Sequence, residues 1–224
     1  MVHQMMDLHV HSVYSDGNAH IEDIVRHASR IRLKIIAITD HCSKTYTYVG
    51  GRMLNPDVAM ERAEVISEVN SRYNNIVVLN GIESDIDGGI VVFPRGLKKD
   101  FFDLVIGSIH KSVSAKVWYQ WSLSAIRSGN IDVLGHPFSY VRENIPFEMV
   151  EEVLIELADH NVAFELNMSY GLPPEDVLLL CKEYDVPVSV GSDAHSLFNV
   201  GMVDAGFSVA KKFGLRIIRP QKRY

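Results

Sequence analysis

The sequence predicts a single α/β barrel that spans residues 1–224. Short apolar runs alternate with longer amphipathic segments from end to end, which is the pattern of repeated βα units around a parallel sheet. A βα unit takes roughly 30 residues, so seven units fill almost the whole chain. Ionisable side chains stand at the end of every apolar run. Together these observations favour one domain with one functional face.

Seven apolar runs are predicted to be strands, at residues 4–10, 34–40, 76–84, 103–110, 131–137, 162–167 and 186–193. Six amphipathic segments between them are predicted to be helices, near residues 21–32, 56–73, 118–128, 147–160, 174–184 and 199–213. Asn55 as capping residue and Pro56 in the first turn mark the start of the second helix. Residues 85–102 break the alternation and are expected to form a hairpin or loop. The basic end of the chain, 216–224, is expected to be a solvated tail.

The composition restricts the class of partner. A formal charge of −6 argues against a broad basic surface for duplex DNA, although a small anionic substrate or a short single strand remains compatible with it. Cys42 and Cys181 are too few for a disulfide framework, which fits a reducing compartment. Because the N-terminus lacks the pattern of a signal peptide and no run reaches transmembrane length, we expect a cytoplasmic protein without a membrane partner.

The ends of the predicted strands carry the residues typical of metal sites. In chain order these residues are His9, His11, Asp40, His41, Glu83, His110, His136, Glu165, Asn167, Asp193 and His195. All strands of a parallel barrel end at the same face, so these side chains are expected to meet there. Mixed His, Asp and Glu ligands without thiolates suit Zn, Mn or Fe. The sequence therefore predicts a centre of divalent metal ions.

Eight motifs occur in a fixed order: DLHVHS, SDG, ITDH, GIE, SIH, GHP, ELN and GSDAH. This series resembles the PHP family, the polymerase and histidinol phosphatase superfamily of metal-dependent phosphoesterases, from residue 7 to about residue 200. It is most similar to the small stand-alone phosphatases of that family and to the PHP domain of bacterial family X DNA polymerases. The resemblance implies a distorted, TIM-like (βα)7 barrel that holds two or three divalent ions.

The resemblance also implies a division of the ligands. The first ion would take His9, His11, Glu83 and Asp193, the second Glu83, His110 and His136, and the third Asp16, His41 and His195. Some relatives have histidine where this chain has Asp16, so the third site departs from their pattern. Glu83, Asp193, His195 and His41 are the residues expected to act in catalysis. Glu83 would bridge two ions that share a hydroxide, the predicted nucleophile.

Several neighbouring residues allow two interpretations. Asp7 and Asp40 either accept a ring N–H of a ligand histidine or cap a loop. Asn167 either orients water or forms a loop, and for Glu165 the strand alternation leaves both directions open. Lys111 and Arg142 are the main candidates to bind the substrate phosphate, with Lys44 and Arg52 as further basic residues in a loop above the strand ends.

Three functions compete at this point. The first is hydrolysis of a small phosphorylated metabolite, which suits the compact size and negative charge. The second is a 3′–5′ exonuclease or phosphodiesterase on single-stranded nucleic acid, which suits the likeness to the polymerase domain. The third is a metal-binding module without catalysis, which a complete ligand set argues against. The sequence makes no prediction about oligomeric state.

Overall fold

The computed structural model describes residues 6–44 and 53–223, which form a nearly closed parallel barrel. Its strands follow the order β1 (Met6–Val10), β2 (Ile35–Ile38), β4 (Val77–Asp87), β6 (Leu104–Ser108), β7 (Val133–Leu134), β8 (Ala163–Asn167) and β9 (Val188–Gly191). The barrel closes where Val10 pairs in parallel with Ala194, just beyond β9. All seven predicted strands are confirmed, while residues 4 and 5 of the first lie outside the described residues.

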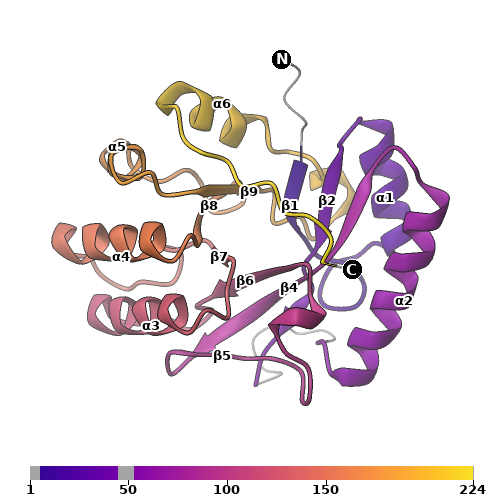
Figure 1. The fold of residues 1–224 in the computed structure, drawn as a ribbon, viewed down its shortest axis with the longest axis horizontal. Coiled ribbons are helices and arrows are strands. Elements are labelled where there is room, and N and C mark those ends of the chain that lie inside the picture. Colours follow the sequence, from indigo (N-terminus) through magenta and orange to yellow (C-terminus); the bar gives the residue numbers. More distant parts are fainter. Residues whose placement is uncertain (1–5, 45–52, 224) are drawn as a thin grey trace.

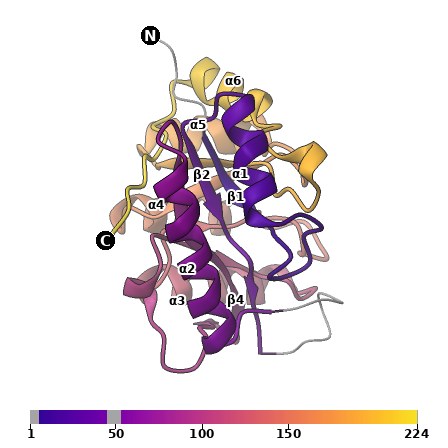
Figure 2. The same ribbon diagram turned by 90° about the vertical axis from the view of Figure 1, so that its right-hand side faces the viewer.

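In the described part of the chain, six α-helices surround the strands: α1 (Ile21–Arg30), α2 (Pro56–Arg72), α3 (Ala115–Arg127), α4 (Phe147–Asp159), α5 (Glu175–Glu183) and α6 (Asp204–Phe213). Figure 1 shows them on the outside of the barrel, and Figure 2 shows α1 and α2 side by side over β1, β2 and β4. The Asn55 side chain accepts a hydrogen bond from the Val58 amide at 3.0 Å, which confirms the predicted cap of α2. Gly214, with φ of 64°, ends α6 in the left-handed conformation.

The segment that interrupts the alternation is a hairpin, as predicted. After β4 the chain turns at Gly88 and Gly89, whose φ angles are 63° and 78°, and returns as β5 (Ile90–Val91) antiparallel to β4. A second short strand, β3 (His41–Cys42), pairs in parallel with β4 and aligns His41 with Glu83. This pairing places two predicted ligands next to each other before any metal is considered.

The hydrophobic core has an inner and an outer part. Apolar residues at the beginnings of the strands fill the barrel, and larger clusters lie between the strands and the helices. The inner residues are Met6, Leu8, Ala37, Leu79, Leu104, Ile106, Val133 and Ala163. Because apolar side chains occupy that end, the polar side chains gather at the other end, where the strands finish.

The C-terminal segment differs from its prediction as a solvated tail. Ile217 and Ile218 pack against the inner core, and the amide of Ile218 donates to the carbonyl oxygen of Val188 at 2.9 Å. Arg223 donates two hydrogen bonds of 2.9 Å to the carboxylate of Asp132. The prediction was wrong because it considered the basic residues and not the apolar contact that the two isoleucines make. The segment covers the end of the barrel opposite the polar residues.

Candidate metal centre

The carboxyl ends of the strands enclose a cavity of about 200 Å³. Seven of the nine predicted ligands line it, together with Tyr140 and Tyr170: Asp16, His41, Glu83, His110, His136, Asp193 and His195. The other two, His9 and His11, are buried with exposed fractions of 0% and 1% and lie within reach of the same carboxylates. The structure thus brings together all nine residues from positions 9 to 195. We call this group of nine residues and its cavity the bowl.

Glu83 occupies the middle of the bowl, and five imidazoles surround its carboxylate. Oε2 lies 2.7 Å from His41 Nδ1, 3.4 Å from His9 Nε2 and 3.5 Å from His11 Nε2. Oε1 lies 3.0 Å from His136 Nε2 and 3.2 Å from His110 Nε2. Each oxygen therefore faces a different set of nitrogens, which is the arrangement that a carboxylate shared by two cations requires.

Within the described residues, three groups of side chains have donor atoms close enough to hold one ion each. They are His9, His11 and Asp193; His41, Glu83 and His110; and His11, Asp16, His41 and His195. Asp193 and His195 thus fall into different groups, although they are only two residues apart. All three groups differ from the division that the resemblance implies: the first lacks Glu83, the second has His41 in place of His136, and the third also contains His11.

The donor atoms of the bowl suit cations. Six buried atoms of these residues make no hydrogen bond within the described residues: His9 Nε2, His11 Nε2, Asp16 Oδ1, His41 Nδ1, Glu83 Oε2 and His136 Nδ1. Buried polar atoms without such bonds are costly unless another partner satisfies them. Nitrogen and carboxylate donors match the preferences of Zn and related divalent ions. The residues present therefore fit a metal centre.

Electrostatics hold the carboxylates ionised. Burial acts to raise the pKa of Glu83, but His110, His41 and His9 lower it well below its ordinary value. Burial likewise acts against ionisation of Asp193, yet His9 and His11 lower its pKa. By contrast, burial and the neighbouring His41 lower the pKa of His11 to about 4. Ionised carboxylates beside a neutral imidazole are the state that binds a metal ion.

Two carboxylates behind the bowl orient ligand histidines. Glu165 Oε1 lies 2.7 Å from His9 Nδ1, and Asp85 Oδ1 lies 2.7 Å from His110 Nδ1. These contacts leave Nε2 of each ring directed at Glu83. The strand pattern in the sequence left the direction of Glu165 open, and Asp85 was not among the predicted site residues. Strand periodicity was the available signal, because Glu165 lies two residues before Asn167, and Asp85 two residues after Glu83.

Asp7 and Asp40 do not contact ligand rings and instead fix loops. Asp7 accepts hydrogen bonds from the backbone amides of Ser192 and Gly201 at 2.9 and 2.8 Å. Asp40 accepts from the amide of Ser12 at 2.8 Å and from the hydroxyl of Ser15 at 2.7 Å. The loop interpretation therefore holds for both residues.

Asn167 forms a loop, which was one of its two interpretations, and it also binds two carboxylates. Its Nδ2 donates to Asp193 Oδ2 and to Glu165 Oε2, both at 3.1 Å. Its Oδ1 accepts from the amides of Ser169 and Tyr170 at 2.9 and 3.2 Å. Asn167 thus orients a predicted ligand and at the same time shapes the loop after β8.

The basic residues lie outside the lining of the bowl. Lys111 Nζ bonds to Asp87 at 2.6 Å, and Arg142 Nε bonds to the hydroxyl of Ser112 at 2.8 Å. Lys44 is exposed, and Arg52 lies outside the described residues. Phosphate binding by Lys111 or Arg142 stays a prediction, and each side chain already has a partner in its own loop region.

A family model for the PHP domain matches residues 7–169 of the chain. The chain belongs to the PHP family. It is accordingly a PHP-type metal-dependent phosphoesterase, as the order of its motifs predicted. The family match covers six of the seven barrel strands and all predicted ligands except Asp193 and His195, which follow its end.

Curated relatives of this PHP domain fall into two kinds. Over 92% of the chain it is 29% identical to the DNA polymerase/3′–5′ exonuclease PolX of Bacillus subtilis (strain 168), but it spans only 37% of that protein's length. Over 94% of the chain it is 27% identical to a protein named "Probable phosphatase" of Thermoanaerobacter sp. (strain X514), of which it spans 87%.

Among solved structures, the PHP domain is similar in fold to histidinol phosphate phosphatase from Lactococcus lactis, which was crystallised with zinc, L-histidinol and phosphate. The TM-score is 0.74 at 19% identity, and the match covers 98% of this chain and 97% of that one. In the described part of the PHP domain, no helix is both long and apolar enough to cross a membrane.

Two tyrosines at the rim were not predicted from the sequence. The hydroxyls of Tyr140 and Tyr170 lie 2.9 Å apart, and both rings stand within 6 Å of the His136 ring, at 5.9 and 4.8 Å between centroids. Each follows its motif, GHP or ELN, by three residues, in a loop that sequence periodicity does not orient. They offer neutral hydrogen-bond donors where basic side chains were expected.

Proposed function

We propose that this PHP domain hydrolyses a small organic phosphomonoester with two or three divalent ions, Zn, Mn or Fe, in the bowl. The nine residues predicted as metal ligands would hold these ions. His9, His11, Glu83 and Asp193 form one site, Glu83, His110 and His136 a second, and Asp16, His41 and His195 a third. The observation that carries the proposal is Glu83, a fully ionised carboxylate with imidazoles on both oxygens.

The ions would supply two things, an activated water nucleophile and positive charge for the phosphate oxygens in the transition state. Side chains of the protein hold the ions, orient the ligands and contact the substrate. Glu83 and Asp193 provide the negative charge that retains the ions, and Glu165 and Asp85 hold two imidazoles in the ligating tautomer. Tyr170 donates a hydrogen bond towards the substrate from the rim.

His195 has two mutually exclusive roles. As a ligand of a third ion its ring is neutral. In the metal-free protein, the hydrogen bond to Asp16, at 3.1 Å from Nε2, raises the pKa of His195 to about 9 against the effect of burial. If no third ion binds, His195 would be free to act as the general acid that protonates the leaving alcohol. The ratio of metal to protein in the active enzyme distinguishes the two roles.

The test is phosphate release by protein that has been stripped of metal and reloaded with Zn, Mn or Fe. An aryl phosphate, a bis-aryl phosphodiester and a labelled oligonucleotide serve as substrates. We expect hydrolysis of the monoester only after reloading, and loss of activity by at least about 10³-fold in Glu83→Gln, since the shared ligand is removed. Glu64→Gln, an exposed position on α2, is the control. Near-normal turnover of Glu83→Gln would refute the role of Glu83.

The second candidate function is a 3′–5′ exonuclease, and the likeness to PolX favours it. A strand of nucleic acid carries several phosphates, which proteins bind with Lys and Arg. Within the described residues, neither a Lys nor an Arg lines the bowl. Shortening of the oligonucleotide without hydrolysis of the monoester would replace the first proposal with this one.

A further inference from the structure

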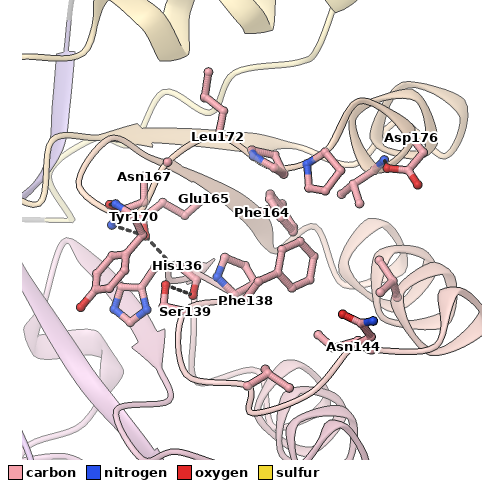
Figure 3. Close-up of a pocket in the computed structure, with 18 of the residues that line it drawn as sticks. His136, Phe138, Ser139, Asn144, Phe164, Glu165, Asn167, Tyr170, Leu172 and Asp176 are labelled. Carbon is pink, nitrogen blue, oxygen red and sulfur yellow. Dashed lines mark hydrogen bonds between the residues drawn. The ribbon is translucent and has the colours of Figure 1, made fainter.

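A second and larger cavity adjoins the bowl. It measures about 570 Å³ and lies between the segment that follows β7 and the segment that follows β8, next to the first turns of α4 and α5. Figure 3 shows His136 and Tyr170 at one end of it and Asn144 and Asp176 at the other. His136 and Tyr170 also line the bowl, so the two cavities share a wall. We call the larger cavity the side cleft.

The side cleft is mainly apolar. Phe138, Ile145, Phe147, Phe164 and Val177 contribute to its lining, and Figure 3 shows Phe138 and Phe164 in its middle. Its volume lies within the range of roughly 300–1,000 Å³ that ligand pockets occupy. An apolar cleft of this size beside a set of metal ligands is the usual form of a site for an organic molecule.

The charged groups of the side cleft have one sign. Glu143, Glu165 and Asp176 line it. Glu143 and Asp176 each accept a backbone hydrogen bond of 2.9 Å, from the amides of Ala115 and Val177 respectively. No Lys or Arg contributes to the wall of the side cleft in the described parts of the chain, 6–44 and 53–223. An anionic group would lose its hydration there and meet carboxylates of like charge, so the cleft excludes polyanions.

We propose that the side cleft binds the alcohol part of the substrate, and that this alcohol is apolar and carries no negative charge. The inference rests on the proposed function, because the bowl must hold the phosphate for the ester bond to lie at the shared wall of His136 and Tyr170. The substrate is then a phosphomonoester with one phosphate and a ring or branched apolar body. Apolar contacts in the cleft contribute binding energy that a methyl or glycerol ester does not gain.

The test uses 1-naphthol as the isolated alcohol and 1-naphthyl phosphate as the ester. Binding of 1-naphthol is measured by calorimetry with metal-free and with metal-loaded protein, and 1-naphthol-4-sulfonate is the anionic probe. We expect the sulfonate to bind at least about tenfold more weakly, a difference of about 1.4 kcal/mol. Equal or tighter binding of the sulfonate would overturn the charge selectivity.

Two variants alter the side cleft without touching the bowl. Phe147→Ala removes part of the wall, and Asn144→Trp places a bulky ring at the mouth, where the side chain is exposed. Ile155→Ala, an exposed apolar position further along α4, and Asn74→Trp, an exposed loop position, are the matched controls. The two Asn→Trp variants make the same change in composition at different locations, and the two Ala variants each remove an exposed apolar side chain from α4.

Each cleft variant should weaken 1-naphthol binding and raise KM for 1-naphthyl phosphate by about three- to tenfold. The kcat for that ester and the KM for methyl phosphate should stay within about twofold of the wild-type values. The lost apolar contacts stabilise the bound substrate and its transition state equally, and methyl phosphate does not make them. The controls should match the wild type. Naphthol binding that is unchanged in both cleft variants would overturn the inference. If the loaded enzyme hydrolyses no monoester, the proposed function fails, while naphthol binding still reports separately on the cleft.

Discussion

Replacement of Glu165 is the sharpest test of how the bowl is assembled. Glu165 is 2% exposed, and its carboxylate meets three nitrogen atoms. Oε1 lies 2.7 Å from His9 Nδ1, while Oε2 accepts from the amide of His136 at 2.7 Å and from Asn167 Nδ2 at 3.1 Å. In the metal-loaded protein, Glu165 Oε1 would keep the single ring proton of His9 on Nδ1, so that Nε2 binds the cation.

Glu165→Gln keeps the shape but replaces one acceptor with a donor. If the amide oxygen of the new side chain faces His136 and Asn167, its NH2 group faces Nδ1 of His9. Nδ1 must then accept a hydrogen bond, so the ring proton of His9 lies on Nε2 and blocks metal binding there. If the amide is flipped, the donors of His136 and Asn167 face an NH2 group. A buried polar group without a partner costs about 1–3 kcal/mol, which equals roughly 5- to 150-fold in affinity. We expect metal affinity to fall by about 10- to 100-fold.

The measurement is metal affinity by competition with a chelator, together with ¹⁵N NMR of the His9 ring to identify the protonated nitrogen. Glu148→Gln, an exposed position on α4, is the control and should leave affinity unchanged. The reasoning is refuted if Glu165→Gln binds metal like the wild type with the proton still on Nδ1.

Further predictions concern Asp85, the ion pair of Arg62 with Asp40, and the effect of metal on stability. Asp85→Asn removes the 2.7 Å partner of His110 and should weaken metal binding by about 10- to 100-fold in the same chelator assay. Arg62→Met breaks the fully buried ion pair with Asp40, 3.0 Å long, and should lower the free energy of unfolding in urea by about 3–5 kcal/mol. Burial acts to raise the pKa of Asp40, but Arg62 lowers it below its ordinary value. The ion pair therefore stabilises the fold above about pH 4, and this stabilisation is lost as the pH falls further. Arg62→Met should move acid unfolding, measured by circular dichroism, to higher pH. Metal at 100 times its Kd should raise the free energy of unfolding by about 2.7 kcal/mol over metal-free protein, and equal stability of the two forms would contradict a preformed site.

The sequence predicted the barrel well because the physical signal is strong. Every buried strand of a parallel barrel appears as a continuous apolar run, and every helix that covers it shows one apolar face. The predicted ligands followed from the same pattern, since the strand ends share one face. His41 joined the site through the short strand β3, which pairs it with Glu83.

The supporting contacts were harder to predict because they depend on neighbours distant in sequence. Glu165 and His9 are 156 residues apart, and only the closed barrel brings them together. Gly191 illustrates the same limit. In the structure a side chain at that position would lie 2.4 Å from His9 Cβ and 2.9 Å from Glu165 Oε1. Gly191 is required by this close approach, which spacing along the chain does not reveal.

The C-terminal segment shows how charge can mislead a sequence prediction. Four of its nine residues are basic, which favours solvent, yet Ile217 and Ile218 need only a short apolar surface to dock. The open end of the barrel offers that surface. Asp132 then pairs with Arg223 and offsets part of the charge.

The positions of the basic residues indicate that positive charge in the bowl has to come from bound cations. Lys111 and Arg142 were expected to bind phosphate, but Asp87 and Ser112 already hold them. The bowl instead concentrates Glu83, Asp193 and Asp16 among imidazoles, and carboxylates alone would repel a phosphate dianion. Positive charge that is bound by these carboxylates reverses this repulsion, and the neutral hydroxyls of Tyr140 and Tyr170 complete the rim. The carboxylates of the bowl therefore disfavour a phosphate in the metal-free protein, and with bound cations the same carboxylates would favour it.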